Sequence, residues 1–246
     1  MGCSDSTPVA EPDALVAQTA LEALFSTPTS AEATTLTSKE KRLDGMMKPA
    51  TMLWSAGEQL VASVKVMNMN KDGMVTTIKD AGGNVIALLK HGDVKSYRRG
   101  TGRAVLYAPR PPAGASGHAS MEGLHAAYEI RLPDDVMETY PPKRDKGGNM
   151  YSRGVQKGGL GFFPAAADGA FSATLAYKLV ALKQGMQDFV LRNNWNLMNS
   201  TGEIIGTYED KSKKTIVAAA GVDVVLLVVY ASVVYDYWST GIDDSG

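Results

Sequence analysis

The residues best suited to chemistry lie at the start of the chain, in Met1-Gly2-Cys3-Ser4-Asp5-Ser6. This hexapeptide matches the N-myristoylation pattern, in which Gly2 becomes the acceptor once Met1 is removed and Ser6 holds the favoured position. Cys3, the only cysteine of the chain, stands beside that glycine and is suited to palmitoylation. One myristoyl chain binds a membrane only weakly, with an association constant of about 10⁴ M⁻¹. We therefore predict acylation at both Gly2 and Cys3.

Clusters of basic residues offer a second kind of chemistry, the binding of anionic phosphate groups. Arginine can bind phosphate through two parallel hydrogen bonds, and each basic residue beside an anionic leaflet contributes about 1 kcal/mol. The same residues would also fit ordinary solvated strand edges, where lysines discourage pairing between sheets. The candidate headgroup-binding residues are Lys90, Lys95, Arg98, Arg99 and Arg103 in one cluster, and Lys211, Lys213 and Lys214 in another. A further cluster, Lys143, Arg144 and Lys146, lies in a Pro/Gly-rich stretch.

Catalytic and metal-binding patterns are not found in the sequence. The histidines, His91, His118 and His125, have neither the spacing of metal ligands nor an accompanying set of carboxylates. The glycine-rich run 157–161 lacks the residue order of a phosphate-binding P-loop. We predict a non-enzymatic protein with no cofactor and no metal, and an active site assembled from distant residues is the alternative. A net charge of −1 gives no reason to expect direct nucleic-acid binding.

The composition changes near residue 45. Residues 4–42 are rich in Ser, Thr, Ala and Pro and poor in aromatic residues. A weak apolar stripe, Leu15, Leu21, Leu24 and Phe25, suggests one short helix beginning at Asp13. No secretory signal follows Met1, and a single cysteine excludes an internal disulfide framework, as expected in the cytosol. We predict a lipidated flexible tether over 1–48, one domain over 49–238 and a polar tail over 239–246.

From about residue 52 the chain alternates polar and apolar residues, as half-buried strands do. Turns that contain Gly and Asn separate several of these runs, which is typical of an antiparallel sheet or barrel. The runs are 60–66, 74–79, 85–89, 171–179 and 189–197.

Two of the predicted hairpins align with each other without gaps, Ile78–Ala87 with Leu197–Gly206. Each has an apolar residue, an Asp or Asn that opens the turn, a glycine suited to positive φ, and then a β-branched pair. Common hairpin chemistry could also produce this match by chance. If the repeat is real, the domain is a pseudo-duplicated β structure.

Residues Ile216–Val234 contain a single charge, Asp223, and hydropathy alone would place them in a membrane. Gly221-Val222-Asp223 instead has the pattern of a helix start, with the carboxylate where the helix dipole favours it. The remaining run, Val224–Tyr235, is short for a bilayer span and apolar on every face, as in a helix surrounded by protein. We predict a buried helix over about 221–238. A span over 216–234 stays open as the alternative, because one charge in the bilayer costs only ~3 kcal/mol.

The hairpin repeat, followed by Lys211–Lys214 and by Ala219-Ala220-Gly221-Val222-Asp223-Val224-Val225-Leu226-Leu227-Val228, resembles the LURP-one-related family. That family belongs with the tubby C-terminal domain and the phospholipid scramblases. The resemblance covers about residues 50–238. It implies a mainly β fold, a closed antiparallel barrel of about twelve strands around a hydrophobic C-terminal helix.

The chain departs from parts of that superfamily. Scramblases carry an acidic calcium loop before the terminal helix, whereas Glu209 and Asp210 are followed here by lysines, too few carboxylates for six to eight oxygen ligands. The basic phosphoinositide pocket of tubby-like proteins does not align residue by residue. Calcium-dependent scrambling is therefore not supported.

Together these patterns predict a membrane-tethered, non-enzymatic domain that recognises phospholipid headgroups and serves in signalling or scaffolding. Its expected partners are anionic lipids, phosphoinositides among them, and signalling proteins. We expect a monomer on the cytosolic face of the plasma membrane or an endomembrane. The alternative is a scramblase-like, lipid-moving protein with 216–234 inserted in the bilayer.

Overall fold

The computed structural model describes most of the chain from Leu15 to Ser239. The described residues are 15–18, 25, 31–42, 49–70, 73–92, 103–110, 120–131, 143–144, 150–151, 160–166, 170–181, 194–209 and 214–239. The predicted acylation sites, Gly2 and Cys3, lie outside them.

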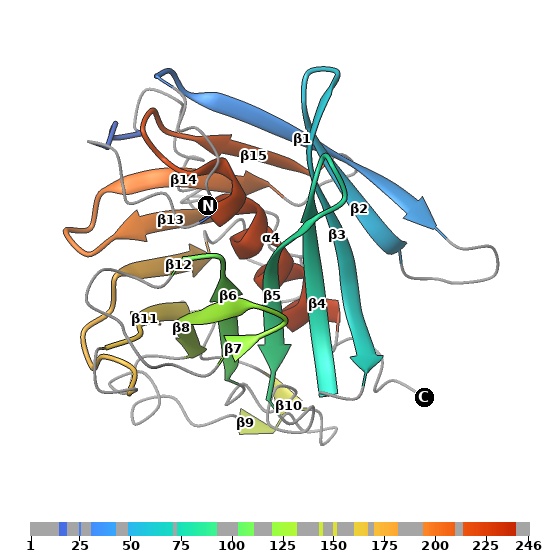
Figure 1. The fold of residues 1–246 in the computed structure, drawn as a ribbon. Coiled ribbons are helices and arrows are strands. Elements are labelled where there is room, and N and C mark those ends of the chain that lie inside the picture. The colour runs from blue at the N-terminus through green and yellow to red at the C-terminus, as the bar shows by residue number, and fades with distance from the viewer. Residues whose placement is uncertain are drawn as a thin grey trace.

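Strands dominate the described residues, with one helix at the C-terminal side (Figure 1). The strands are β1 (Thr34–Arg42), β2 (Pro49–Ala56), β3 (Gln59–Asn70), β4 (Gly73–Asp80), β5 (Val85–His91), β6 (Ala104–Ala108), β7 (Ser120–Met121), β8 (Leu124–Arg131), β9 (Lys143–Arg144), β10 (Met150–Tyr151), β11 (Leu160–Pro164), β12 (Tyr177–Ala181), β13 (Asn194–Asn199), β14 (Ile204–Glu209) and β15 (Thr215–Ala218). The helix is α4 (Val224–Ser239).

Twelve strands form a closed antiparallel barrel. Their order around the barrel is β1-β2-β3-β4-β5-β6-β8-β11-β12-β13-β14-β15, and β15 pairs with β1. The pairing of β8 with β11 closes the ring on the other side. Strand β7 pairs with β8 outside the ring, and β9 and β10 form a separate two-stranded sheet. The predicted fold class is confirmed.

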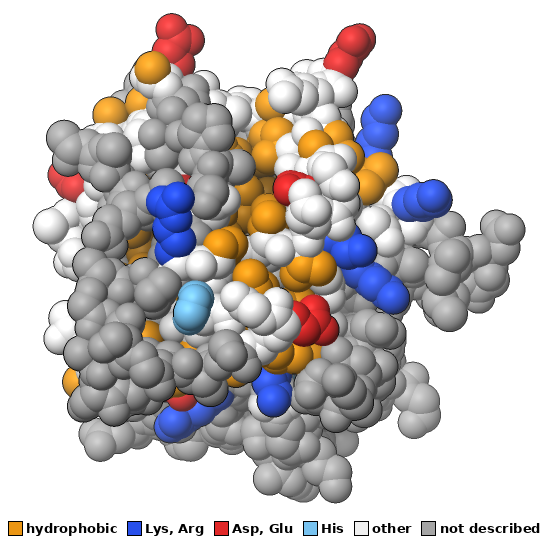
Figure 2. Space-filling view, in the orientation of Figure 1, with side chains coloured by type: hydrophobic (Ala, Val, Ile, Leu, Met, Phe, Trp, Pro, Cys, Tyr) orange, Lys and Arg blue, Asp and Glu red, His pale blue; other side chains and the backbone are white. Residues whose placement is uncertain are grey.

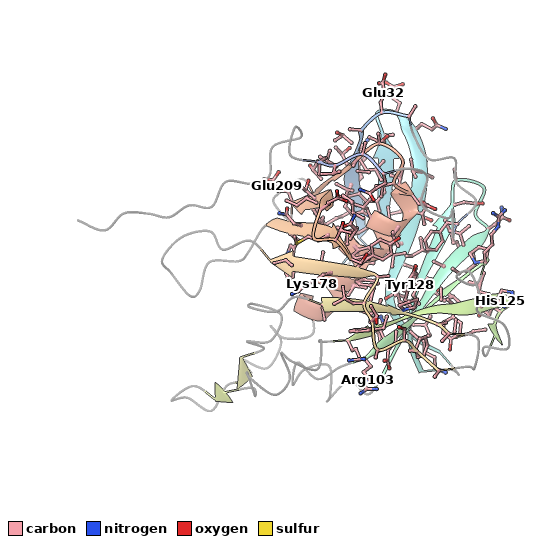
Figure 3. All side chains as sticks on the ribbon, turned by 90° about the vertical axis from the view of Figure 1, so that its left-hand side faces the viewer. Glu32, Arg103, His125, Tyr128, Lys178 and Glu209 are labelled. Carbon is pink, nitrogen blue, oxygen red and sulfur yellow. The ribbon has the colours of Figure 1, made fainter. Side chains whose placement is uncertain are left out.

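Since neighbouring strands run antiparallel, their connections alternate between the two ends of the barrel. We call the end where α4 begins the N-end; it also holds the turns 80–84 and 199–203. The end toward which α4 runs is the C-end, where β5, β8 and β14 finish. Figure 3 shows Glu209 of the C-end and His125, near the N-end, on opposite sides of the molecule.

Helix α4 is the core of the barrel and lies between its walls in Figure 1. Every side chain from Val224 to Val233 is at most 8% exposed, so the helix is buried on all faces. Asp223 caps it, since one carboxylate oxygen accepts a hydrogen bond of 2.9 Å from the Val225 amide. The predicted helix start is confirmed, with the first helical residue three positions later than we expected.

Aromatic rings join the helix to the strands around it. The Tyr230 ring stacks on Phe162 of β11, with centroids 4.0 Å apart, and meets Tyr177 of β12 edge-on at 6.3 Å. Tyr128 of β8 packs edge-on against both strand rings. Complete burial raises the pKa of the Tyr230 hydroxyl well above its usual value, so Tyr230 is neutral in the core.

The two hairpins that align in sequence have the same backbone geometry. In the first, the Gly83 amide donates to the Asp80 carbonyl at 3.1 Å, and Gly202 donates to Asn199 at the same distance in the second. Both glycines have a φ of 85°. The pairing of β4 with β5 and that of β13 with β14 are also interrupted at equivalent positions.

The hairpins also occupy equivalent places in the ring. Hairpin β4–β5 holds the fourth and fifth positions of the ring, and β13–β14 holds the tenth and eleventh, six strands later. A duplication of six strands would place the two hairpins at this half-ring spacing. The pseudo-duplication inferred from the sequence is therefore supported by both geometry and position.

The apolar segment Ile216–Val234 is not one helix. Residues Thr215–Ala218 form β15, a turn follows at Gly221 with a φ of 78°, and only then does α4 begin. Within the described part of the chain, no helix combines the length and the apolar character needed to cross a membrane.

The N-terminal boundary needs correction. Strand β1 falls inside the 1–48 range predicted as a tether, and it pairs with β2 and β15 as part of the barrel wall. Its sequence is polar because only Leu36 and Ser38 are buried in it. The domain therefore begins before residue 49.

The helix predicted from Asp13 is also corrected. Residues 15–18 are not helical, because their backbone bonds to the barrel: Val16 donates to the Ile204 carbonyl and Gln18 to the Ala220 carbonyl, both at 2.9 Å. Leu21 and Leu24 lie outside the described residues. Phe25 is 2% exposed and belongs to the main core.

Two predicted strands are shorter than their alternating patterns. Of 171–179, only the part from Tyr177 is strand, since the Ser172 amide bonds to the carbonyl of Pro164, at the end of β11, and the Ala176 amide bonds to that of Phe162, in its middle. Of 189–197, the strand begins at Asn194, and residues 189–193 lie outside the description. Tyr177, Leu179, Trp195 and Leu197 are buried as the alternation predicted.

Candidate functional site

Charged side chains are distributed unevenly between the two ends of the barrel. Among the described residues, the N-end carries more acidic than basic side chains and the C-end carries more basic ones. The N-end has Glu32, Glu58, Asp80, Glu122 and Glu203 against Lys79, Arg110 and Lys178. The C-end has Lys41, Lys90, Arg103, Arg131 and Lys214 against Glu40, Glu129 and Glu209. In Figure 2, acidic side chains stand at the tips of two turns at the upper edge.

Hydrogen bonds within the two repeated turns hold their carboxylates in the charged form. Asp80 accepts from the side chain of Asn84 at 3.0 Å and from its amide at 2.8 Å, and these bonds lower the pKa of Asp80 below its usual value. Glu203 accepts from the Asn199 side chain at 2.7 Å and from Thr201 at 3.0 Å, which lowers its pKa in the same way. The N-end therefore stays negative at neutral pH.

Lys90 and Arg103, predicted as members of one basic cluster, lie on neighbouring strands of the C-end. Lys90 of β5 pairs with Val105 of β6, and Arg103 stands two residues before Val105 on the same face. Next in the row is Glu129 of β8, opposite Val105. Leu89 and Leu106, which alternate with these residues, are buried in the main core. The row therefore lies on the outer face.

Two arginines share the single carboxylate of this row. Arg103 contacts Glu129 at 3.2 Å, with 62% of its side chain exposed, and Arg131 contacts the other oxygen at 2.9 Å, with 12% exposed. One carboxylate between two guanidinium groups leaves a net positive charge, and Lys90 adds to it. Because a guanidinium has five N–H donors, Arg103 keeps donors that face solvent.

An aromatic ring fixes the inner arginine. The Arg131 guanidinium lies 3.8 Å from the centroid of Phe163, which is on β11 opposite Glu129. The Phe163 ring folds back over Gly161, where a Cβ atom would be only 2.6 Å from the ring. Glycine at this position thus admits the ring, the ring supports Arg131, and Arg131 orients Glu129 toward Arg103.

Lys214 lies elsewhere at the C-end. It precedes β15, six positions around the ring from β6, so it is on the opposite wall from Arg103. Its side chain bonds to Glu40 of β1 at 2.6 Å and is 11% exposed. The structure therefore unites Lys90 and Arg103 but separates them from Lys214.

The other predicted binding residues, Lys95, Arg98, Arg99, Lys211 and Lys213, lie outside the described residues. In the sequence, residues 93–102 separate Gly92, which follows β5, from Arg103, which precedes β6, and the Arg103 carbonyl accepts the Gly92 amide at 2.8 Å. Residues 210–213 likewise join the C-end of β14 to that of β15. The side chains of Lys143 and Arg144 are not described, and Lys146 falls in a gap.

Comparison with solved structures shows a likeness in fold size and coverage. No family model matches the chain, and no curated protein matches it. An X-ray structure of a protein from Arabidopsis thaliana resembles it with a TM-score of 0.48 and 11% sequence identity. That likeness covers 93% of this chain and 97% of the other.

The sequence missed Glu129, Arg131 and Phe163 as parts of the basic row. They stand in two alternating strands about thirty residues apart, and only the pairing of β8 with β11 brings them together. Over the described ranges, no group of three or more His, Cys, Asp or Glu side chains is placed to hold a metal ion.

Proposed function

We propose that this protein is a membrane-tethered, non-enzymatic domain that recognises anionic phospholipid headgroups with the C-end of its barrel. The observation that carries the proposal is the row Lys90, Arg103, Glu129 and Arg131, which presents an exposed guanidinium in a net positive setting. Myristate on Gly2 and palmitate on Cys3 would supply the attachment, on the cytosolic face of the plasma membrane or an endomembrane. Phosphoinositides fit the chemistry as the most highly charged of these lipids.

The electrostatics of the whole barrel support this choice of surface. An anionic leaflet attracts the basic C-end and repels the acidic N-end, so the molecule would approach with a preferred orientation. In the sequence, Lys95, Arg98 and Arg99 fall between β5 and β6, and Lys211 and Lys213 fall between β14 and β15, strands whose facing ends are at the C-end. A signalling or scaffolding role would then leave the N-end open to protein partners.

Vesicle co-sedimentation of unacylated protein tests the proposal. Lys90→Ala/Arg103→Ala removes two cations from the C-end, and at about 1 kcal/mol each their loss should weaken binding to anionic vesicles roughly 30-fold. The matched control is Lys79→Ala/Arg110→Ala, which removes two exposed cations from the N-end and should leave binding nearly unchanged. Inorganic phosphate as competitor separates a lipid surface from a site for free phosphate.

If both double variants lost the same amount of binding to anionic vesicles, the loss would reflect overall charge alone. That result would contradict a specific C-end surface. Unchanged binding in Lys90→Ala/Arg103→Ala would contradict the proposed function itself. Rising ionic strength should weaken wild-type binding, because exposed charges are screened over about 8–10 Å near physiological salt.

A further inference from the structure

Residues Leu15–Gln18, which we call the strap, are bound to the N-end of the barrel. Their two backbone bonds reach β14 and the turn before α4, at Ile204 and Ala220. The Gln18 side chain also meets Asn199 of the second repeated turn at 3.3 Å, and Leu15 packs against the main core. Val16 is 38% exposed, so the strap lies on the surface rather than within the barrel.

Gly221 provides the space that the strap occupies. A Cβ atom at this position would overlap the carbonyl oxygen of Gln18 and crowd the backbone around it. The other described glycines with positive φ (Gly57, Gly83, Gly123 and Gly202) have no atom within 4 Å of such a Cβ. The left-handed conformation alone therefore does not explain the close approach at Gly221.

The strap determines how much chain separates the barrel from an acyl group on Gly2. With the strap bound, that chain is residues 3–14, with a contour length of about 40 Å at ~3.4 Å per residue. With the strap released and Phe25 still in the core, it is residues 3–24, about 75 Å. For flexible chains of these lengths the root-mean-square spans are about 19 Å and about 26 Å.

The root-mean-square span with the strap bound falls well short of the height of the barrel, whereas the span with the strap released approaches it. The longest strand, β3, has 12 residues. At ~3.3 Å per residue and a tilt of ~40°, such a strand rises about 30 Å along the barrel axis. The strap is at the N-end, whereas the exposed Arg103 is at the C-end. An anchored molecule with a bound strap could therefore turn its C-end to the bilayer only by stretching the tether well beyond its root-mean-square span, to about three-quarters of its contour length.

We propose that the bound strap is an autoinhibitory contact, which competes with the binding of the C-end to the bilayer that holds the acyl anchor. The bound strap keeps the acidic N-end near the membrane. Its release lengthens the tether and lets the basic C-end reach the headgroups. By linkage, anionic lipid in turn favours the released strap. This inference rests on the proposed function, both for the anchor and for the C-end surface.

The test uses myristoylated protein in a Cys3→Ser background, so that membrane partition is reversible and measurable. Gly221→Ala should displace the strap, and Gly83→Ala is its control, because it strains another positive-φ glycine whose added Cβ would meet no atom within 4 Å. Hydrogen exchange at the Val16 and Gln18 amides reports the strap directly. A second releasing variant, Val16→Pro/Gln18→Pro, removes both donors and leaves the barrel sequence intact.

We expect both releasing variants to expose these amides and to raise partition onto anionic vesicles, on the order of threefold to tenfold. The partition of both releasing variants onto neutral vesicles should equal that of wild type. The partition of Gly83→Ala onto anionic vesicles should also equal that of wild type. The gain should vanish in Gly2→Ala protein, which has no anchor to limit its reach. The inference would be overturned if the amides became exposed without a gain in partition onto anionic vesicles. It would also be overturned if Gly2→Ala protein, which carries no myristate, showed an equal gain.

Failure of the proposed function looks different. In that case Lys90→Ala/Arg103→Ala would bind anionic vesicles as well as wild type, with or without the strap. The proposed competition between the strap and the binding of the C-end to the bilayer would then be overturned too. Hydrogen exchange at Val16 and Gln18 would still show a bound strap.

Discussion

At the scale of single residues, the position that best reports the packing of the barrel on its helix is Gly206 of β14. A Cβ atom there would overlap the Cδ2 atom of Leu227 on α4. The equivalent residue of the first repeat is Ala87, which is fully buried without such a conflict. The two halves of the barrel thus differ at this contact with the helix.

We predict that Gly206→Ala lowers the free energy of unfolding by about 1–3 kcal/mol, the usual cost of overpacking a dense core. Urea denaturation measures it. Leu227→Ala creates space at the same contact, so the Gly206→Ala penalty should shrink in that background. Penalties that simply add would show that Gly206 and Leu227 do not interact.

Asp80 and Glu203 make a second prediction at this scale, on pH. Hydrogen bonds lower both pKa values in the folded state, so their stabilising effect is present above the unfolded pKa and is lost as pH falls through the folded one. Asp80→Asn/Glu203→Gln should therefore destabilise the protein at pH 7 more than at pH 3. Urea midpoints at the two pH values test this, and an equal effect at both would contradict it.

At the scale of elements, the sequence predicted what depends on neighbouring residues. The turn glycines Gly83 and Gly202, and the cap at Asp223, are local signals, and the structure confirms all three. The buried helix followed from a run that is apolar on every face. Its identification as the centre of a closed twelve-stranded barrel came from the family resemblance, and the observed ring confirms the fold.

Elements that depend on distant partners were missed or misjudged. Strand β1 has one large apolar residue, Leu36, and is held in place by β2 and β15 rather than by its own pattern. The strap looked helical because Leu15 and Phe25 fit a stripe, but barrel carbonyls outcompete local helix bonds. The contact of Arg103 with the Glu129–Arg131 pair likewise depends on the pairing of β6 with β8, which no local signal reveals.

At the scale of the whole molecule, antiparallel closure brings lysines and arginines that are scattered in the sequence to one end of the barrel. Alternate connections fall at the same end, so clusters far apart in the sequence gather at the C-end while the acidic turns gather at the N-end. Lys214 and Arg103 share that end from opposite walls. We therefore propose that the bound molecule is oriented, with its C-end facing the headgroups.

The most direct measurement compares the depth of two labels on unacylated Gly2→Ala/Cys3→Ser protein bound to anionic vesicles. With the only native cysteine gone, Lys41→Cys marks the C-end and Glu58→Cys marks the N-end, both at exposed positions. A fluorophore on each is quenched by nitroxide-bearing lipid. The account predicts strong quenching at position 41 and little at position 58. Equal quenching, or stronger quenching at position 58, would contradict it.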